Sequence, residues 1–213
     1  MKKHRIIYIF LLIILISKNI TYASTTETSK SNYDSSIQYY AQLDGNIQEK
    51  YNCGPAVLKM VFSIFDKKTE VSYEEIRKIA GNKSKGLYTT EVKKALDAYK
   101  IPYSENSYIN SKQLIEIIDN GDIAILCVDM GEIEHIRTEE YFWGKNTETL
   151  KTGHYILLTG YQYKEGKVYF EVLDPYNRKI GTKYIYSPLN YYESGCLEKA
   201  IKNWYTKVLI IDK

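Results

Sequence analysis

The sequence predicts an α+β fold, in which helices of the N-terminal half pack on an antiparallel sheet formed by the C-terminal half. Three amphipathic segments follow one another between residues 71 and 121, and two of them end at a glycine. Four runs of aromatic, β-branched and apolar residues come next along the chain. A block of helices followed by a block of strands is typical of the α+β class.

The first expected helix begins at Cys53. Pro55 suits the first turn of a helix, where its missing N–H costs nothing, and apolar residues recur after it at helical spacing. Gly81 and Gly121 can adopt the left-handed conformation with which many helices end. Further helices are therefore expected at residues 71–81, 89–100, 110–121 and 189–204.

The expected strands lie on both sides of a short turn. The segment KEGK, residues 164–167, is typical of a hairpin turn, so the runs before and after it are antiparallel neighbours. Pro175 cannot donate to a sheet ladder, and the second run therefore ends before it. The sheet is expected to contain residues 123–130, 155–163, 168–173 and 207–211.

The N-terminus has the layout of a secretory signal peptide. Basic residues precede an unbroken apolar run at residues 6–16, and a polar stretch leads to the small residue Ala23. Eleven apolar residues are fewer than the roughly 18 that a membrane-spanning helix needs. We expect cleavage after Ala23, a flexible polar lead at residues 24–36 and one domain at residues 37–213. The alternative is an uncleaved anchor that continues through Ile20.

Removal of the signal changes the charge of the chain. The full sequence has 29 basic and 26 acidic residues, and residues 1–23 hold four of the basic ones, so 25 remain and the net charge becomes −1. The sequence shows no basic patch with interleaved aromatic residues. A nucleic-acid partner therefore has no electrostatic support, and nothing in the sequence indicates an obligate oligomer.

The three cysteines are too few and too scattered for a disulfide scaffold, even in an exported protein. Cys127 lies in an apolar run and is expected to be a buried, inert thiol, whereas Cys196 lies in an expected helix. Cys53 differs, because the positive end of a helix dipole favours the nucleophilic thiolate. The alternative for Cys53 is a small apolar residue that enters the core.

Two histidines remain after removal of the signal, and they differ in context. His154 stands at the start of a core strand, where its side chain can face a cleft as a general base. His135 lies in a polar segment, residues 131–152, and is expected to be a solvated loop residue. Acidic residues surround His135, but no second histidine or cysteine stands at ligand spacing, so we expect no metal site.

Asp174 is the expected partner of His154. The hairpin brings the start of one strand and the end of the other to the same edge of the sheet, so the carboxylate can hold the imidazole in one tautomer. The alternatives are an ordinary Asp-Pro turn at this position and Asn177 as the orienting residue.

These elements together resemble the C39-like branch of the papain-fold cysteine peptidases. The resemblance rests on Gln48 upstream of NCGPAVLKMV, then GHYILLTGY, then VLDPYN, in that order, and covers about residue 39 to the C-terminus. It implies a papain-like fold with Cys53 as nucleophile, His154 as general base and acid and Asp174 as its orienting group. Gln48 matches the glutamine that donates to the oxyanion, with Gln42 as the alternative. No cofactor is implied.

The chain also departs from the best-known members of that branch, which are leader-removing domains fused to peptide exporters. It has a signal sequence and shows no ATPase segment, so we expect a secreted or cell-surface peptidase that acts on a peptide or protein. The polar and aromatic segment at residues 131–152 is expected either to overhang the cleft or to be an ordinary loop. Two alternatives are a cell-wall amidase with the same chemistry and an inactive binding module of the same fold.

Overall fold

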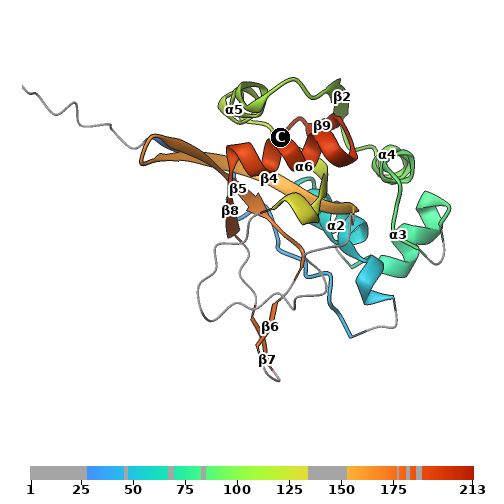
Figure 1. The fold of residues 1–213 in the computed structure, drawn as a ribbon. Coiled ribbons are helices and arrows are strands. Elements are labelled where there is room, and N and C mark those ends of the chain that lie inside the picture. The colour runs from blue at the N-terminus through green and yellow to red at the C-terminus, as the bar shows by residue number, and fades with distance from the viewer. Residues whose placement is uncertain are drawn as a thin grey trace, which may run out of the picture.

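An antiparallel sheet separates two groups of helices in the computed structural model of this protein (Figure 1). Each strand is antiparallel to its neighbours, and the long hairpin of β4 (Gly153–Lys164) and β5 (Lys167–Leu173) runs through the middle of the molecule. The structure describes residues 28–45, 48–66, 70–82, 85–133, 153–176, 178–180, 183–185 and 189–213. None of the helices within these ranges is long and apolar enough to cross a membrane.

The sheet contains seven strands, of which β1 pairs with β4 beyond the end of β3. The order of the others is β2 (Tyr103–Ser107), β9 (Lys207–Ile211), β3 (Ile123–Asp129), β4 (Gly153–Lys164), β5 (Lys167–Leu173) and β8 (Leu189–Glu193). A separate small hairpin consists of β6 (Arg178–Ile180) and β7 (Lys183–Ile185).

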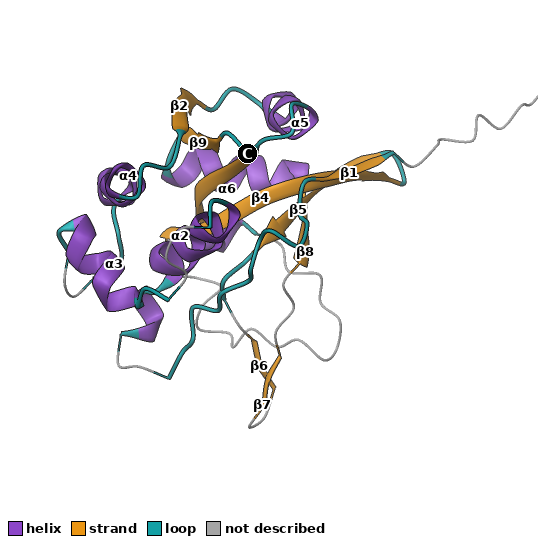
Figure 2. Cartoon of the chain, turned by 180° about the vertical axis from the view of Figure 1, so that it is seen from behind, coloured by secondary structure: helices purple, strands orange, loops and turns teal. Residues whose placement is uncertain are grey.

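Helices cover both faces of the sheet (Figure 2). One face packs against α2 (Cys53–Ile64), with α3 (Tyr73–Ala80) and α4 (Thr89–Ala98) beside it. The other face packs against α5 (Ser111–Asp119) and α6 (Ser194–Trp204). Because side chains alternate along a strand, β3 contributes Ile125 and Cys127 to the first core and Leu126 and Val128 to the second. The α+β prediction is confirmed.

The helix ends follow the local sequence. Ser72 and Glu75 form a reciprocal capping box at the start of α3. Gly81 ends the same helix with a φ of 86°, a conformation that a glycine adopts without steric cost. The Asn110 side chain caps α5 by accepting from the N–H groups of Lys112 and Gln113.

The expected helix at residues 189–204 is wrong in its first part. Its first five residues are the strand β8, which pairs with β5, and α6 begins only at Ser194. Tyr191 and Tyr192, which have strand propensity, lie in this strand. The sequence analysis also missed β2, because the edge strand YSENS is mostly polar and exposed and shows little apolar alternation.

The expected flexible lead is wrong for residues 28–36. The strand β1 (Ser29–Ser31) pairs with β4, and the Asn32 side chain donates to the carbonyls of Ile118 and Asp122, at 2.8 Å each. A polar segment can join a sheet because the ladder uses backbone groups alone. Gly160 allows this approach, since a Cβ there would lie 2.5 Å from the Lys30 carbonyl. The expected signal peptide, residues 1–23, lies outside the described residues.

Candidate active site

Cys53 is the first residue of α2, as the sequence predicts, and its exposed fraction is only 8%. Asn52 caps the helix, and its carbonyl accepts the N–H of Ala56 at 2.8 Å. The N–H groups of the first turn have no partner within the helix, and this end carries the positive pole of the helix dipole. Gly54 lets the helix start pack tightly, because a Cβ there would lie 3.2 Å from the Cβ of Leu87.

The β4–β5 hairpin brings His154 and Asp174 together. In the ladder Leu157 is opposite Leu173, so the residue after β5 reaches the start of β4. His154 Nε2 lies 2.7 Å from Asp174 Oδ1, and both side chains are buried. The hairpin argument from the sequence thus predicted this pair correctly.

His154 also interacts with Cys53 and lowers the pKa of its thiol. Because Nε2 is engaged by Asp174, Nδ1 is the ring atom that remains for the sulfur. Backbone N–H groups of Gly54 and Tyr155 donate to the same sulfur. The thiol therefore sits among donors at the positive end of a helix, where a thiolate is favoured.

The pKa values of the three groups are shifted together. Burial raises the pKa of Cys53. The interaction with His154 and the donors of the backbone lower it by more, so the net shift is downward. Burial lowers the pKa of His154, whereas the charge and hydrogen bond of Asp174 raise it to about 10. Burial raises the pKa of Asp174, and His154 brings it below its usual value. The arrangement favours a thiolate and imidazolium pair beside a carboxylate.

Tyrosines surround Asp174. Tyr192 on β8 donates its hydroxyl to Oδ2 at 2.6 Å, and the N–H of Tyr176 donates to Oδ1 at 2.8 Å. The Tyr39 hydroxyl donates to the backbone carbonyl of Asp174 at 2.8 Å. The sequence did not predict these contacts, because Tyr192 was expected in a helix. The tyrosine pair at 191–192 was the available signal.

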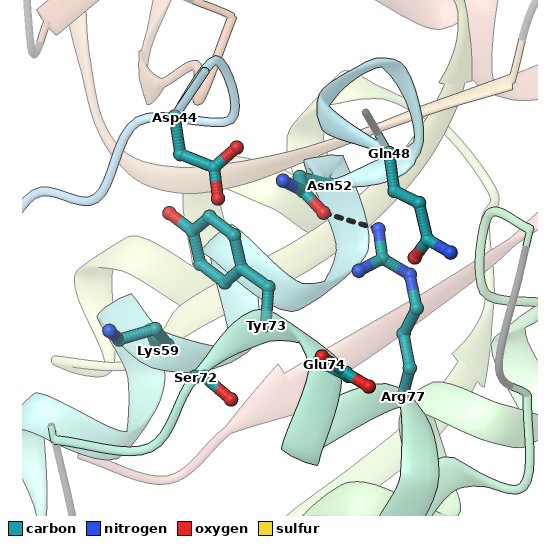
Figure 3. A pocket seen from close by; sticks show the side chains of 8 residues that line it. All are labelled: Asp44, Gln48, Asn52, Lys59, Ser72, Tyr73, Glu74 and Arg77. Carbon is teal, nitrogen blue, oxygen red and sulfur yellow. Dashed lines mark hydrogen bonds between the residues drawn. The ribbon is translucent and has the colours of Figure 1, made fainter. Parts of the chain in front are cut away.

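The two glutamines upstream of Cys53 have different surroundings. Gln48 lines a cavity of about 480 Å³, where its amide lies beside the guanidinium of Arg77 (Figure 3). The backbone N–H of the buried Gln42 donates to the Pro175 carbonyl at 2.6 Å, and its backbone carbonyl accepts from the Asn52 side chain at 3.1 Å. Hydrogen bonds thus join Gln42 to the residue after Asp174 and to the residue before Cys53.

A second cavity, of about 530 Å³, opens beside Cys53. Its walls come from the segment before α4, the adjoining ends of β3 and β4, and the end of α6. It is lined by Cys53, Lys85, Gly86, Leu87, Tyr88, Thr89, Thr90, Cys127, Gly153, Tyr155, Trp204 and Tyr205. A Cβ on Gly153 would lie 2.2 Å from the Trp204 indole, so glycine lets the tryptophan pack against the start of β4. The lining combines aromatic and apolar side chains with one cation.

Of the other residues considered in the sequence, two cysteines are described by the structure, whereas His135 and Asn177 are not. Cys127 is buried, and burial raises the pKa of its thiol to about 12, as expected of an inert thiol. Cys196 is half-buried on α6. His135, Asn177 and residues 134–152 of the polar segment lie outside the described residues.

Comparison with known proteins gives a family and a fold. The model of the Peptidase_C39 like family matches residues 35–205. A Bacillus anthracis protein described as a C39-like peptidase superposes with a TM-score of 0.58 at 14% identity, covering 87% of this chain and 98% of the other. None of the curated proteins matches the sequence.

Two further structures are similar. UfSP from C. elegans gives a TM-score of 0.50 at 13% identity, over 92% of this chain and 36% of the other. The second is the peptidase domain of Streptococcus ComA, a bi-functional ABC transporter involved in a quorum sensing pathway. Its TM-score is 0.47 at 17% identity, and the match covers 83% of this chain and 99% of the other. The fold of this protein is papain-like, with N-terminal helices and a C-terminal antiparallel sheet.

Proposed function

Because the chain belongs to the Peptidase_C39 like family, we propose that it is an exported cysteine peptidase that acts through Cys53, His154 and Asp174. One observation supports this most strongly: a buried cysteine at a helix start interacts with a buried histidine, which lowers the pKa of the thiol and lies 2.7 Å from a buried carboxylate. This order of nucleophile, base and orienting acid performs acyl transfer in cysteine peptidases. The proposal that the protein is exported rests on the sequence of residues 1–23 alone.

The reaction has two steps. The Cys53 thiolate attacks the carbonyl carbon of a peptide bond, and the His154 imidazolium protonates the leaving amine, which leaves an acyl group on the sulfur as a thioester. His154, now neutral, takes a proton from water as the water attacks the thioester. The carboxylic acid then leaves and the sulfur regains its thiolate form. Asp174 keeps Nε2 protonated and directs Nδ1 toward the sulfur.

We assign the oxyanion donors to the N–H of Cys53 and the side chain of Gln42. The Oε1 atom of Gln42 is buried and has no donor in the described part of the chain, and Nε2 is 3.5 Å from the Lys50 carbonyl. Rotating the amide by 180° would give up the long hydrogen bond that Nε2 donates to the Lys50 carbonyl and would direct an N–H to the place where Oε1 now has no donor. A substrate oxyanion would supply an acceptor there.

The test of the peptidase uses a mixed peptide library, read by mass spectrometry of the products. Cys53→Ala and His154→Ala each abolish cleavage and leave thermal unfolding cooperative, whereas the control His135→Ala retains full activity. If His135→Ala abolished cleavage and His154→Ala were tolerated, His154 would not be the base. Release of muropeptides from purified peptidoglycan, with no cleavage of the library, would replace the peptidase with a cell-wall amidase.

The two glutamines form a matched pair for the oxyanion assignment. Gln42→Ala removes one oxyanion donor and should lower kcat by about 100-fold or more, because such a donor acts mainly in the transition state. Gln48→Ala should leave kcat within about threefold of wild type, since a surface substitution away from the reacting atoms has small effects. If Gln48→Ala gives the large loss instead, the original assignment from the sequence holds.

A further inference from the structure

Arg77 on α3 is almost completely buried, with an exposed fraction of 2%. Among the described residues, no carboxylate lies within 4 Å of its guanidinium, although a buried cation without a paired anion is costly. Its charge must therefore be offset in another way. Both of its side-chain hydrogen bonds go to segments beside the candidate active site.

The first of these hydrogen bonds goes to the residue before the nucleophile. Arg77 Nη2 donates to Oδ1 of Asn52 (Figure 3). Asn52 is 1% exposed, and its Nδ2 donates in turn to the Gln42 carbonyl at 3.1 Å. Both ends of the Asn52 amide are thus occupied. Arg77 orients this amide, and the amide joins the start of α2 to the loop that carries Gln42.

The second hydrogen bond leads to the opposite wall of the site. Arg77 Nε donates to the Lys85 carbonyl at 3.4 Å. Lys85 begins the segment that lines the cavity beside Cys53. One side chain therefore connects the loop before the nucleophile with the segment that faces it.

The charges near Arg77 agree with this geometry. Burial lowers the pKa of the guanidinium, and the negative charges of Asp44, Cys53 and Glu74 oppose that shift. Asp44 and Glu74 line the same cavity as Arg77, whereas Cys53 begins the helix above Asn52. Because Asn52 directly precedes Cys53, the guanidinium that binds Asn52 is placed where its positive charge favours the thiolate form of Cys53.

We propose that Arg77 is a positioning residue of the catalytic centre, which aligns Cys53 and Gln42 through Asn52 and supplies a buried positive charge for the thiolate. The proposal rests on the proposed peptidase function. Arg77 does not line the cavity beside Cys53 and acts through its neighbours. Its loss should therefore lower kcat and leave KM nearly unchanged, because uniform substrate binding is not affected.

The experiment compares Arg77→Ala and Arg77→Lys with the control Lys78→Ala, an exposed neighbour on the same helix. The first readout is the rate of iodoacetamide alkylation of Cys53 against pH, followed at the Cys53 peptide by mass spectrometry. Arg77→Ala should move the midpoint of this profile to higher pH by roughly one unit, which lowers the rate about tenfold at pH values below the wild-type midpoint. Arg77→Lys keeps the charge and should restore much of the rate, and Lys78→Ala should match wild type.

The second readout is the kinetics on a peptide that the wild-type protein cleaves. Both Arg77 variants should lose at least about tenfold in kcat with KM within twofold, since lysine cannot make the two directed hydrogen bonds of a guanidinium. Methylguanidinium ion at millimolar concentration should partly restore kcat of Arg77→Ala, because the 480 Å³ cavity leads to the vacated place. Methylammonium ion, which lacks the planar donor group, should not.

A purely structural role predicts different results. If Arg77→Ala unfolds at lower temperature but its folded fraction keeps the wild-type alkylation profile and kcat, the proposal is wrong. If Arg77→Ala does not fold, the alkylation profile and kcat of Arg77→Lys are compared with those of wild type instead. If the wild-type protein cleaves no peptide, the proposed function fails, and the alkylation profile alone still decides whether Arg77 stabilises the thiolate.

Discussion

Each oxygen of the Asp174 carboxylate accepts at least one hydrogen bond from the protein. Oδ1 receives His154 Nε2 and the N–H of Tyr176, and Oδ2 receives the Tyr192 hydroxyl. A buried carboxylate held by this many donors keeps its charge, because each donor stabilises the ionised form. The imidazole beside it is thereby held protonated and correctly oriented.

The shifted pKa values predict how Cys53 reacts with pH. His154 lowers the pKa of the thiol, so wild-type alkylation by iodoacetamide should already be fast near pH 6 and change little up to pH 9. In His154→Ala the thiol returns toward its ordinary pKa of about 8.5, and the rate should fall at pH 6 and rise roughly tenfold per pH unit toward pH 8. Stopped-time alkylation with mass spectrometry measures both profiles. Identical profiles would contradict the ion pair.

A second prediction concerns Tyr192. Tyr192→Phe removes the donor to Oδ2 and leaves a buried carboxylate oxygen unpaired, which should lower the free energy of unfolding by about 1.5–3 kcal/mol. It should also lower kcat/KM, since Asp174 is held less firmly. Tyr191→Phe is the matched control, because its hydroxyl contacts Glu171 at 3.1 Å, away from His154. Chemical denaturation and steady-state kinetics test the pair, and equal effects of both substitutions would contradict the assignment.

At the scale of elements, the β4–β5 hairpin and the start of α2 position the site. The turn between these strands holds Glu165 and Gly166, both with positive φ, as a tight hairpin requires. The antiparallel register then sets which residue of β5 lies near His154. Because α2 packs on β4 through the first core, its first residue lies over the same end of the sheet.

The strand β1 yields a prediction at this scale. Asn32→Ala removes two side-chain hydrogen bonds to carbonyls at the end of α5 and should lower the free energy of unfolding by about 1–3 kcal/mol. Ser29→Ala, the control at an exposed position of the neighbouring strand β1, should change it by less than about 0.5 kcal/mol. Both variants should keep the wild-type alkylation rate of Cys53. An Asn32→Ala protein as stable as wild type would show that β1 contributes little.

At the scale of the whole molecule, two cores on opposite faces of one sheet support the site from behind. The helices α5 and α6 bury one face, and α2 to α4 bury the other (Figure 2). The proposed catalytic residues lie at one end of the sheet, where β4 begins and β5 ends. Substitution of Cys53 or His154 should therefore leave both cores largely intact.

Export is a prediction about the whole chain. Expressed in full in a bacterial host, the protein should appear outside the cytoplasm with Ser24 as its first residue, because signal peptidase cuts after small residues such as Ala23. N-terminal sequencing of the extracellular fraction measures this. A control with Leu11 and Leu12 both changed to arginine should block export by breaking the apolar run. Recovery of the wild-type chain with Met1 in the membrane fraction would support the uncleaved anchor.

The sequence by itself determined the elements that depend on local patterns. Pro55 and the spaced apolar residues predicted the start of α2, and Gly81 predicted the end of α3. The KEGK turn predicted the hairpin, and with it the meeting of His154 and Asp174. These predictions are correct because periodicity, proline and glycine determine the backbone conformation over only a few residues.

The tertiary structure decided what depends on distant partners. The polar strand β1 forms because β4 offers unpaired backbone groups there, and β8 forms because β5 pairs with it. The tyrosine that supports Asp174 lies 18 residues away in sequence, and the arginine that holds Asn52 lies 25 away. No local pattern records such contacts, because long-range hydrogen bonding and burial are set only when the sheet and the helices come together.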